Sequence, residues 1–208
     1  MKKLIGLLVT GFLLLSLGAC SKKDSAAKTA DGGSAKELIY VFIKNRGDLA
    51  YWDSIAEGGD RAAAAFSEKA VVRVVETTAD LTANLTAMYE AADAGAGLII
   101  TASDYKDNAV EIANKFPDIP CVVIGENVAG SNIYCIDFRS SEASFLAGVI
   151  AADIASQGIE GTRKSNVVGF VGGVDETLVI QEFFAGYIQG AKYYDPSVKI
   201  VYNYVGGW

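Results

Sequence analysis

The sequence predicts an α/β protein built on a parallel β-sheet. Short runs rich in β-branched residues alternate along the chain with helical patterns, and several of these runs are hydrophobic almost without interruption. Continuous hydrophobic runs are typical of strands that are covered on both faces. Regular alternation of strands and helices indicates a parallel sheet with flanking helices.

The body of the chain is expected to contain seven strands. They are predicted at residues 38–43, 71–75, 98–101, 121–125, 133–138, 167–171 and 198–204. The helices between them carry their own signals. Asp80 precedes an apolar stripe that begins at Leu81, and Pro117 and Pro120 end the third helix before the next strand, since proline is excluded from helix interiors.

The N-terminal segment predicts a processed leader. Lys2 and Lys3 precede an uncharged run that is shorter than the roughly 20 residues of a membrane-spanning helix, as in a secretory signal. The tetrad Leu17-Gly18-Ala19-Cys20 resembles the bacterial lipoprotein box, so we expect residues 1–19 to be cleaved and Cys20 to carry lipid. The alternative is an ordinary signal peptide with an incidental cysteine.

Residues 20–36 are expected to form a lipid anchor and a disordered tether. Ser, Ala, Gly, Lys and Asp dominate this segment, which cannot bury enough apolar surface to order itself. Acyl chains on Cys20 would hold the domain on the extracytoplasmic side of a bacterial membrane, without spanning it. The expected location is therefore the cell envelope.

Composition removes several function classes. Loss of the leader changes the formal charge from −7 to −9, which argues against a nucleic-acid partner. The absence of histidine removes Ser-His-Asp and Cys-His catalysis and HExxH zinc sites, so we expect no enzyme, no cofactor and no metal. Cys121 and Cys135 lie in strand-like runs, which favours buried thiols over a disulfide.

Ligands of open α/β sheets lie beyond the carboxyl ends of the strands, so we expect the site in the segments that follow the strands. They supply carboxylates, a hydroxyl and aromatic rings suited to a small polar ring compound. These candidates are Asp48, Tyr51, Trp52, Ser103, Asp104, Glu126 and Asp175. For Asp48 and Asp175 a helix-capping role is an equal alternative. Gly172 and Gly173 lack a Walker lysine, which argues against a phosphate site.

Four motifs of the chain carry a resemblance to a known family. The stretches at residues 138–148, 168–173, 183–192 and 204–208 resemble the basic membrane protein family of lipoproteins, which includes purine nucleoside receptors. The resemblance implies a type I periplasmic-binding fold, whose two lobes close on a nucleoside and deliver it to an ABC permease. It also adds Phe183 to the expected ligand contacts.

Three positions depart from the family pattern. Tyr51 stands where the family has phenylalanine, which keeps a ring for stacking on a base, and Trp52 replaces an asparagine whose amide is thereby lost. The fourth strand ends in Gly125 and Glu126, where family members commonly have aspartate. The acceptor for a ribose hydroxyl is thus expected one residue later.

The chain is expected to hold one complete lobe at 37–158 and a partial second lobe at 159–208, so that it resembles a truncated receptor. A single complete lobe leaves much of a ligand in water, so binding by this chain alone is expected to be weak or absent. The alternatives are a sugar or autoinducer receptor of the same fold, and a surface lipoprotein that acts in interactions or as an antigen.

Overall fold

The structure is a computed structural model that describes residues 35–159 and 161–207. The predicted leader, the lipidation site Cys20 and nearly all of the predicted tether lie outside the described residues. Within the described ranges, no helix is both long and apolar enough to cross a membrane. The predictions about processing and lipidation therefore stay predictions.

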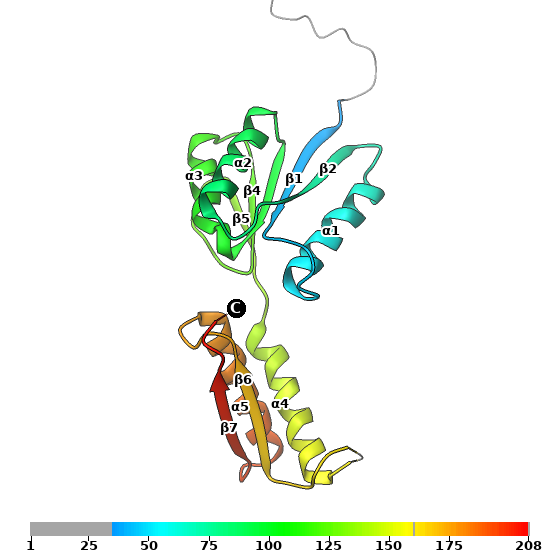
Figure 1. Ribbon diagram of the computed structural model, residues 1–208, viewed down its shortest axis with the longest axis vertical. Helices are drawn as coiled ribbons and strands as arrows, with labels where there is room; N and C mark the ends of the chain where they lie inside the picture. The colour runs from blue at the N-terminus through cyan, green and yellow to red at the C-terminus, as the bar shows by residue number, and fades with distance from the viewer. Residues whose placement is uncertain (1–34, 160, 208) are drawn as a thin grey trace, which may run out of the picture. The chain divides into compact units, whose positions relative to one another are not determined.

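Five parallel strands form the larger sheet (Figure 1). Its strands are β1 (Glu37–Ile43), β2 (Ala70–Glu76), β3 (Leu98–Ala102), β4 (Cys121–Ile124) and β5 (Ile133–Ile136). Their order is β2-β1-β3-β4-β5, and every neighbouring pair is parallel. Since parallel neighbours need crossover connections, helices lie on both faces of the sheet.

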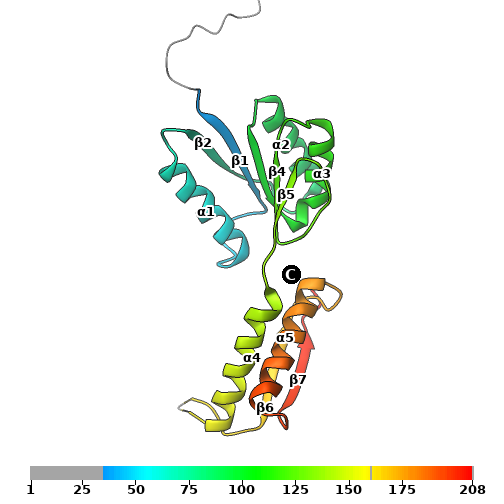
Figure 2. The ribbon, with the colours of Figure 1, turned by 180° about the vertical axis from the view of Figure 1, so that it is seen from behind.

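The helices divide between the two faces (Figures 1 and 2). Helix α1 (Tyr51–Ala65) packs on β2 and β1, while α2 (Leu81–Asp93) and α3 (Lys106–Lys115) lie on the opposite face. A short 3-10 helix, η1 (Ser103–Tyr105), joins β3 to α3. The core on the α2 and α3 side is closed: the fully buried side chains there include Ile99, Thr101, Cys121 and Val123.

The remaining elements form a second group around a two-stranded parallel sheet. Its members are α4 (Ser140–Gln157), β6 (Val167–Gly172), α5 (Leu178–Tyr194) and β7 (Lys199–Tyr204). Helices α4 and α5 approach so closely that a Cβ at Gly190 would lie 1.9 Å from the Phe145 carbonyl oxygen. Only glycine permits this approach of the two backbones.

The parallel α/β fold predicted from the sequence is confirmed. All seven expected strands are present, and the largest difference is that β5 ends at Ile136 instead of residue 138. Cys121 and Cys135 are free thiols, as predicted, but only Cys121 is buried, whereas Cys135 is partly exposed. The lobe boundary at residue 158 stays a prediction, although α4, which it assigns to the first lobe, packs on α5 and β6.

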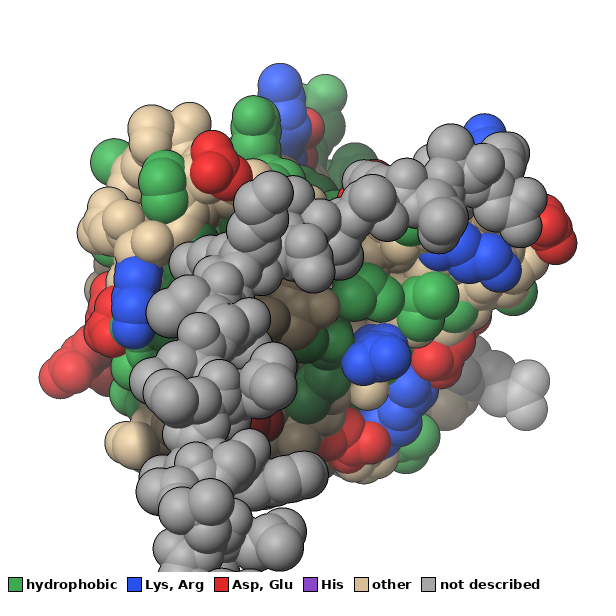
Figure 3. Space-filling view, turned by 90° about the horizontal axis from the view of Figure 1, so that it is seen from above, with side chains coloured by type: hydrophobic (Ala, Val, Ile, Leu, Met, Phe, Trp, Pro, Cys, Tyr) green, Lys and Arg blue, Asp and Glu red, His purple; other side chains and the backbone are tan. Residues whose placement is uncertain are grey.

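The surface carries mixed charge where it is visible from above (Figure 3). In that view Lys and Arg side chains lie beside Asp and Glu side chains, with hydrophobic side chains between them. Some opposite charges at the surface form ion pairs, as in the contact of Arg46 Nη1 with Asp60 Oδ2 at 2.8 Å.

Candidate functional site

Tyr51 lies at the carboxyl edge of the five-stranded sheet, at the first turn of α1. Its hydroxyl donates a hydrogen bond to the Ile124 carbonyl oxygen at 3.0 Å, which ties α1 to the end of β4. Partial burial raises the pKa of Tyr51, so this hydroxyl stays protonated at neutral pH. The residue is still 37% exposed, which leaves ring surface available for a ligand.

Gly125 makes room for the Tyr51 hydroxyl. It follows β4 with a φ of 92°, a conformation that residues with side chains rarely adopt. A Cβ at this position would lie 2.8 Å from the Tyr51 hydroxyl and 3.6 Å from Ser103 Oγ. The two hydroxyls therefore surround the space where a side chain of residue 125 would stand.

Trp52 is buried and packs from behind the site. Its ring contacts Tyr51 edge to face, with centroids 5.2 Å apart, and lies 5.8 Å from the ring of Tyr105. Such contacts hold aromatic rings in fixed orientations. In this structure Trp52 supports the orientation of Tyr51.

Asp48 organises the loop that leads into α1. Its carboxylate accepts hydrogen bonds from the backbone N–H groups of Ala50 at 3.0 Å, Trp52 at 2.9 Å and Asp53 at 3.0 Å. These bonds, with that of Trp52 foremost, lower the pKa of Asp48 because they favour the charged form. The contacts are those of the helix-capping alternative.

Ser103 and Asp104 follow β3 in the short helix η1. The Ser103 side chain is half-buried and approaches the Gly125 position, whereas Asp104 is exposed. The structure thus brings Ser103 and Tyr51 together at one edge of the sheet, with Asp104 next to Ser103 in the chain.

Glu126 forms an ion pair with Lys106, a residue that is not among the candidates predicted from the sequence. Lys106 Nζ, from the start of α3, donates to Glu126 Oε1 in a partly exposed ion pair. The hydrogen bond to Glu126 raises the pKa of Lys106, so the ammonium stays charged. In the sequence, the candidate Asp104 lies close to Lys106. The ion pair itself could not be predicted, because the approach of Lys106 to Glu126 depends on how β3 and β4 are paired.

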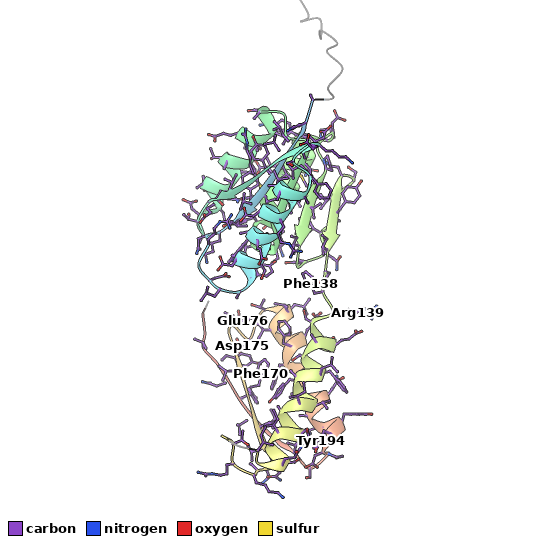
Figure 4. The ribbon with its side chains drawn as sticks, turned by 90° about the vertical axis from the view of Figure 1, so that its right-hand side faces the viewer. Phe138, Arg139, Phe170, Asp175, Glu176 and Tyr194 are labelled. Atoms are coloured by element: carbon purple, nitrogen blue, oxygen red, sulfur yellow. The ribbon has the colours of Figure 1, made fainter. Side chains whose placement is uncertain are left out.

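Asp175 and Phe183 belong to the second group of elements. Asp175 lies in the loop between β6 and α5, at the end where α4 begins after Arg139 (Figure 4). Its carboxylate is exposed, and its carbonyl oxygen accepts a hydrogen bond from Gln181 Nε2 at 2.9 Å. Phe183 is half-buried on α5, where its carbonyl oxygen accepts from Ser144 Oγ at 2.6 Å.

The polar groups at the sheet edge suit an uncharged ligand with hydroxyl groups. The candidate side chains combine carboxylates and hydroxyls with one partly exposed ring, which can accept and donate hydrogen bonds and stack. Within residues 35–159 and 161–207, no three His, Cys, Asp or Glu side chains are grouped in a way that could hold a metal ion.

Solved structures place the fold in a known class. The chain is similar to an ABC transporter solute-binding protein from Aeropyrum pernix K1, with a TM-score of 0.67 and 26% identity over 83% of this chain and 48% of the other. A carbohydrate transporter solute-binding protein from Agrobacterium radiobacter, in complex with D-arabinose, gives a TM-score of 0.61 at 13% identity, over 83% and 59%. The fold is that of type I periplasmic binding proteins.

A family model narrows this class further. Residues 36–208 match the family described as ABC transporter substrate-binding protein PnrA-like, and the chain belongs to this family. It is 28% identical over 210 residues to basic membrane protein D of Borreliella burgdorferi (strain JD1), covering 93% of this chain and 53% of that protein. It is 27% identical over 214 residues to an uncharacterized lipoprotein of Pyrococcus abyssi, covering 99% and 51%.

These matches also bear on length. The chain spans about half the length of the curated relatives it matches. It likewise covers between 48% and 59% of the two solved structures named above.

Proposed function

We propose that this chain is a membrane-anchored solute-binding lipoprotein of an ABC-type transporter, with a nucleoside as its ligand and a purine nucleoside first among the candidates. It would bind its ligand and release it unchanged to a permease, without acting as an enzyme. The observation that carries the proposal is Tyr51, whose partly exposed ring is held at the carboxyl edge of the sheet by the bond to Ile124. Membership of the substrate-binding family supports it.

Each group at this edge has a proposed role. Tyr51 would stack on the base, for which an aromatic ring contributes about 1 to 3 kcal/mol. Glu126, held by Lys106, and Asp104 would accept hydrogen bonds from sugar hydroxyls, while Ser103 can donate or accept. Asp48 and Trp52 would act by holding Tyr51 in place. Asp175 and Phe183 would contribute contacts from the second group of elements.

The location and the anchor are part of the same proposal. Cys20 would carry lipid and residues 21–36 would link it to the folded part, on the extracytoplasmic side of the cell envelope. The relative from Pyrococcus abyssi, whose name describes it as a lipoprotein, supports this.

Thermal unfolding with a panel of ligands tests the proposed ligand class. The chain from Ser21 would be heated with adenosine, guanosine and inosine, and separately with D-ribose and D-arabinose. Bound ligand raises the melting temperature by mass action, by roughly 5 to 10 °C when its concentration is 100 times the Kd. We expect nucleosides to raise it, at ligand concentrations well above micromolar because binding by this chain alone is expected to be weak.

Variants at the sheet edge make this test specific. Tyr51→Ala is expected to weaken nucleoside binding about 5-fold to 150-fold, the equivalent of the lost stacking energy. Tyr51→Phe keeps the ring but loses the hydrogen bond to Ile124, so its binding should lie between those of Tyr51→Ala and the unchanged chain. Tyr193→Ala removes a 77% exposed ring of α5 and should bind as well as the unchanged chain. Equal binding by Tyr51→Ala, or a submicromolar Kd for the unchanged chain, would contradict these expectations. Unchanged binding by Glu126→Gln would remove Glu126 from the site.

A sugar is the second candidate ligand. The solved structure with D-arabinose has the same fold, and carboxylates and hydroxyls suit a free pentose as well as a ribose. In the same panel, this alternative predicts that D-ribose or D-arabinose raises the melting temperature while the nucleosides do not.

A further inference from the structure

Tyr105 is buried between two parts of the proposed site. It is the least exposed tyrosine among the described residues, at 1%. It is the last residue of η1, whose first residue is Ser103, and its ring centroid lies 5.8 Å from that of Trp52. The Trp52 ring in turn contacts the ring of Tyr51. Tyr105 therefore connects the segment that follows β3 with the aromatic pair at the start of α1.

The hydroxyl group of Tyr105 is anchored to the backbone of another segment. It donates a hydrogen bond to the carbonyl oxygen of Thr78. Burial raises the pKa of Tyr105, so the hydroxyl keeps the proton that it donates. The ring is thus held at one end by the backbone of η1 and at the other end by Thr78. A ring that is held at both ends provides a fixed support for the Trp52 ring beside it.

Thr78 has a backbone conformation that is rare for its residue type. Its φ is 60°, in the left-handed region, where a β-branched residue is an outlier. Its N–H donates to the Lys44 carbonyl oxygen at 2.7 Å, while its own carbonyl oxygen accepts from Tyr105. Such conformations persist where the surrounding contacts hold them, and they are most frequent at functional sites. Tyr105 thus helps to hold an unusual conformation two residues after the carboxyl end of β2.

A network of buried polar side chains fixes the segment that contains Thr78. Asn84 Nδ2 donates to Thr77 Oγ1 at 2.9 Å, and Asn108 Nδ2 donates to Asn84 Oδ1 at 2.8 Å. All three side chains belong to residues that are less than 10% exposed, and they join α2 and α3 to the segment after β2. Hydrogen bonds in such buried networks make their surroundings rigid. The carbonyl group that holds Tyr105 therefore belongs to a rigid part of the molecule.

We propose that Tyr105 is a positioning residue for the ligand site, which holds the ring of Tyr51 in place through Trp52 from its anchor on Thr78. The inference rests on the proposed function, because that function assigns the Tyr51 ring to the ligand. Tyr105 is too deeply buried to contact a ligand and would act only through its neighbours. Edge-to-face and tilted ring contacts are directional, so a displaced Tyr105 ring would displace the two rings that follow it.

A double-mutant cycle on nucleoside binding tests whether Tyr105 acts through Tyr51. In the chain from Ser21, which keeps every described residue, Tyr105→Leu is expected to weaken binding about 2-fold to 10-fold, the equivalent of one aromatic contact. Added to Tyr51→Ala, it should weaken binding no further, because the ring that Tyr105 holds is already absent. Tyr105→Phe keeps the ring and loses the bond to Thr78, so it should cause a smaller loss. Tyr89→Leu is the matched control.

Tyr89 resembles Tyr105 in its contacts but not in its place. Its hydroxyl donates to Glu111 Oε1 at 2.6 Å, and its ring lies edge to face with that of Phe116, with centroids 6.0 Å apart. Tyr89→Leu should therefore bind as well as the unchanged chain.

Fluorine NMR measures the position of the Tyr51 ring without any ligand. The protein would be labelled with 3-fluorotyrosine, and the Tyr51 resonance would be identified by its absence in Tyr51→Phe. Tyr105→Leu should shift this resonance and Tyr105→Phe should shift it less, whereas Tyr89→Leu should leave it in place. A tyrosine that only stabilised the fold would not move the resonance of a ring that it does not contact. Circular dichroism of each variant checks its helix content, and Tyr105→Phe, which keeps the buried ring, carries the test if Tyr105→Leu does not fold.

Two outcomes would overturn the proposal. The first is a Tyr51 resonance that stays in place in the folded Tyr105 variants. The second is a loss of binding by Tyr105→Leu that remains in full in the Tyr51→Ala chain, since Tyr105 would then act on another part of the site, such as Ser103. If no nucleoside or sugar binds the unchanged chain, the proposed function fails, and the resonance alone decides whether Tyr105 holds the Tyr51 ring.

Discussion

Asp48 shows how one carboxylate can position a ligand-binding side chain without contacting the ligand. Its three hydrogen bonds to backbone N–H groups hold the first turn of α1, and Tyr51 is the residue at which that helix begins. Asp53 supports the same loop by accepting from the N–H groups of Gly47 at 2.7 Å and Leu49 at 2.8 Å. The conformation of this loop therefore depends on the carboxylates of Asp48 and Asp53.

Asp48→Ala is expected to lower the melting temperature by about 2 to 4 °C at neutral pH, the size of effect that loss of a helix cap produces. The pKa of Asp48 is lowered by folding, so its stabilisation is present above the ordinary aspartate pKa and is lost as the pH falls through the folded value. The gap between variant and unchanged chain should therefore narrow at acid pH. Asp118→Ala, at an exposed carboxylate, is the control, and a gap independent of pH would contradict the capping role.

At the scale of elements, the backbones of α4 and α5 approach each other closely at three glycines. A Cβ at Gly148 would lie 2.1 Å from the Tyr187 carbonyl oxygen, and a Cβ at Gly186 would lie 2.1 Å from the Ser141 carbonyl oxygen. Backbone atoms cannot move aside as a flexible side chain can. Any side chain at these positions must separate the two helices.

Gly190→Ala is accordingly expected to destabilise the fold by about 1 to 3 kcal/mol, the usual cost of an overpacked contact. Gly58→Ala is the matched control, because Gly58 lies inside α1 and a Cβ added there would have no atom within 4 Å. It should stabilise the fold by about 0.5 to 1 kcal/mol through helix propensity. Denaturant unfolding of both variants measures the difference, and equal effects would show that helix propensity alone matters at both positions.

The helices and strands can be predicted well from the sequence, whereas the contacts between them cannot. Hydrophobic runs define strands through local pattern, which predicts β3 and β4 almost where they lie. The ion pair of Lys106 with Glu126 depends on the pairing of β3 with β4, which no local pattern specifies. The burial of Trp52 could not be predicted from the sequence for a similar reason. It depends on a contact with the ring of Tyr105, so local pattern alone leaves Trp52 as a candidate ligand contact.

At the scale of the whole molecule, the helices cover the two faces of the larger sheet unequally. The α2 and α3 side of the larger sheet is closed, while the α1 side of that sheet and the outer face of α4 are exposed and apolar. The matched relatives and solved structures are about twice as long as this chain.

The predicted anchor is tested on the whole protein in a bacterial host. Cys20→Ser is expected to abolish acylation and to move most of the protein out of the membrane fraction, because each lost methylene removes about 0.8 kcal/mol of membrane affinity. Cys135→Ser replaces a thiol of the folded part and should leave fractionation unchanged. Retention of Cys20→Ser in the membrane at the level of the unchanged protein would contradict anchoring through this residue.

The contact between Tyr51 and Gly125 also constrains how this sequence can vary. Because the tyrosine hydroxyl fills the space beside residue 125, a side chain at 125 collides with it unless residue 51 loses that hydroxyl. The two positions are 74 residues apart in the sequence. A side chain at 125 is thus disfavoured twice, by the positive φ of Gly125 and by the tyrosine hydroxyl, so a tyrosine at position 51 is expected to be accompanied by glycine at 125.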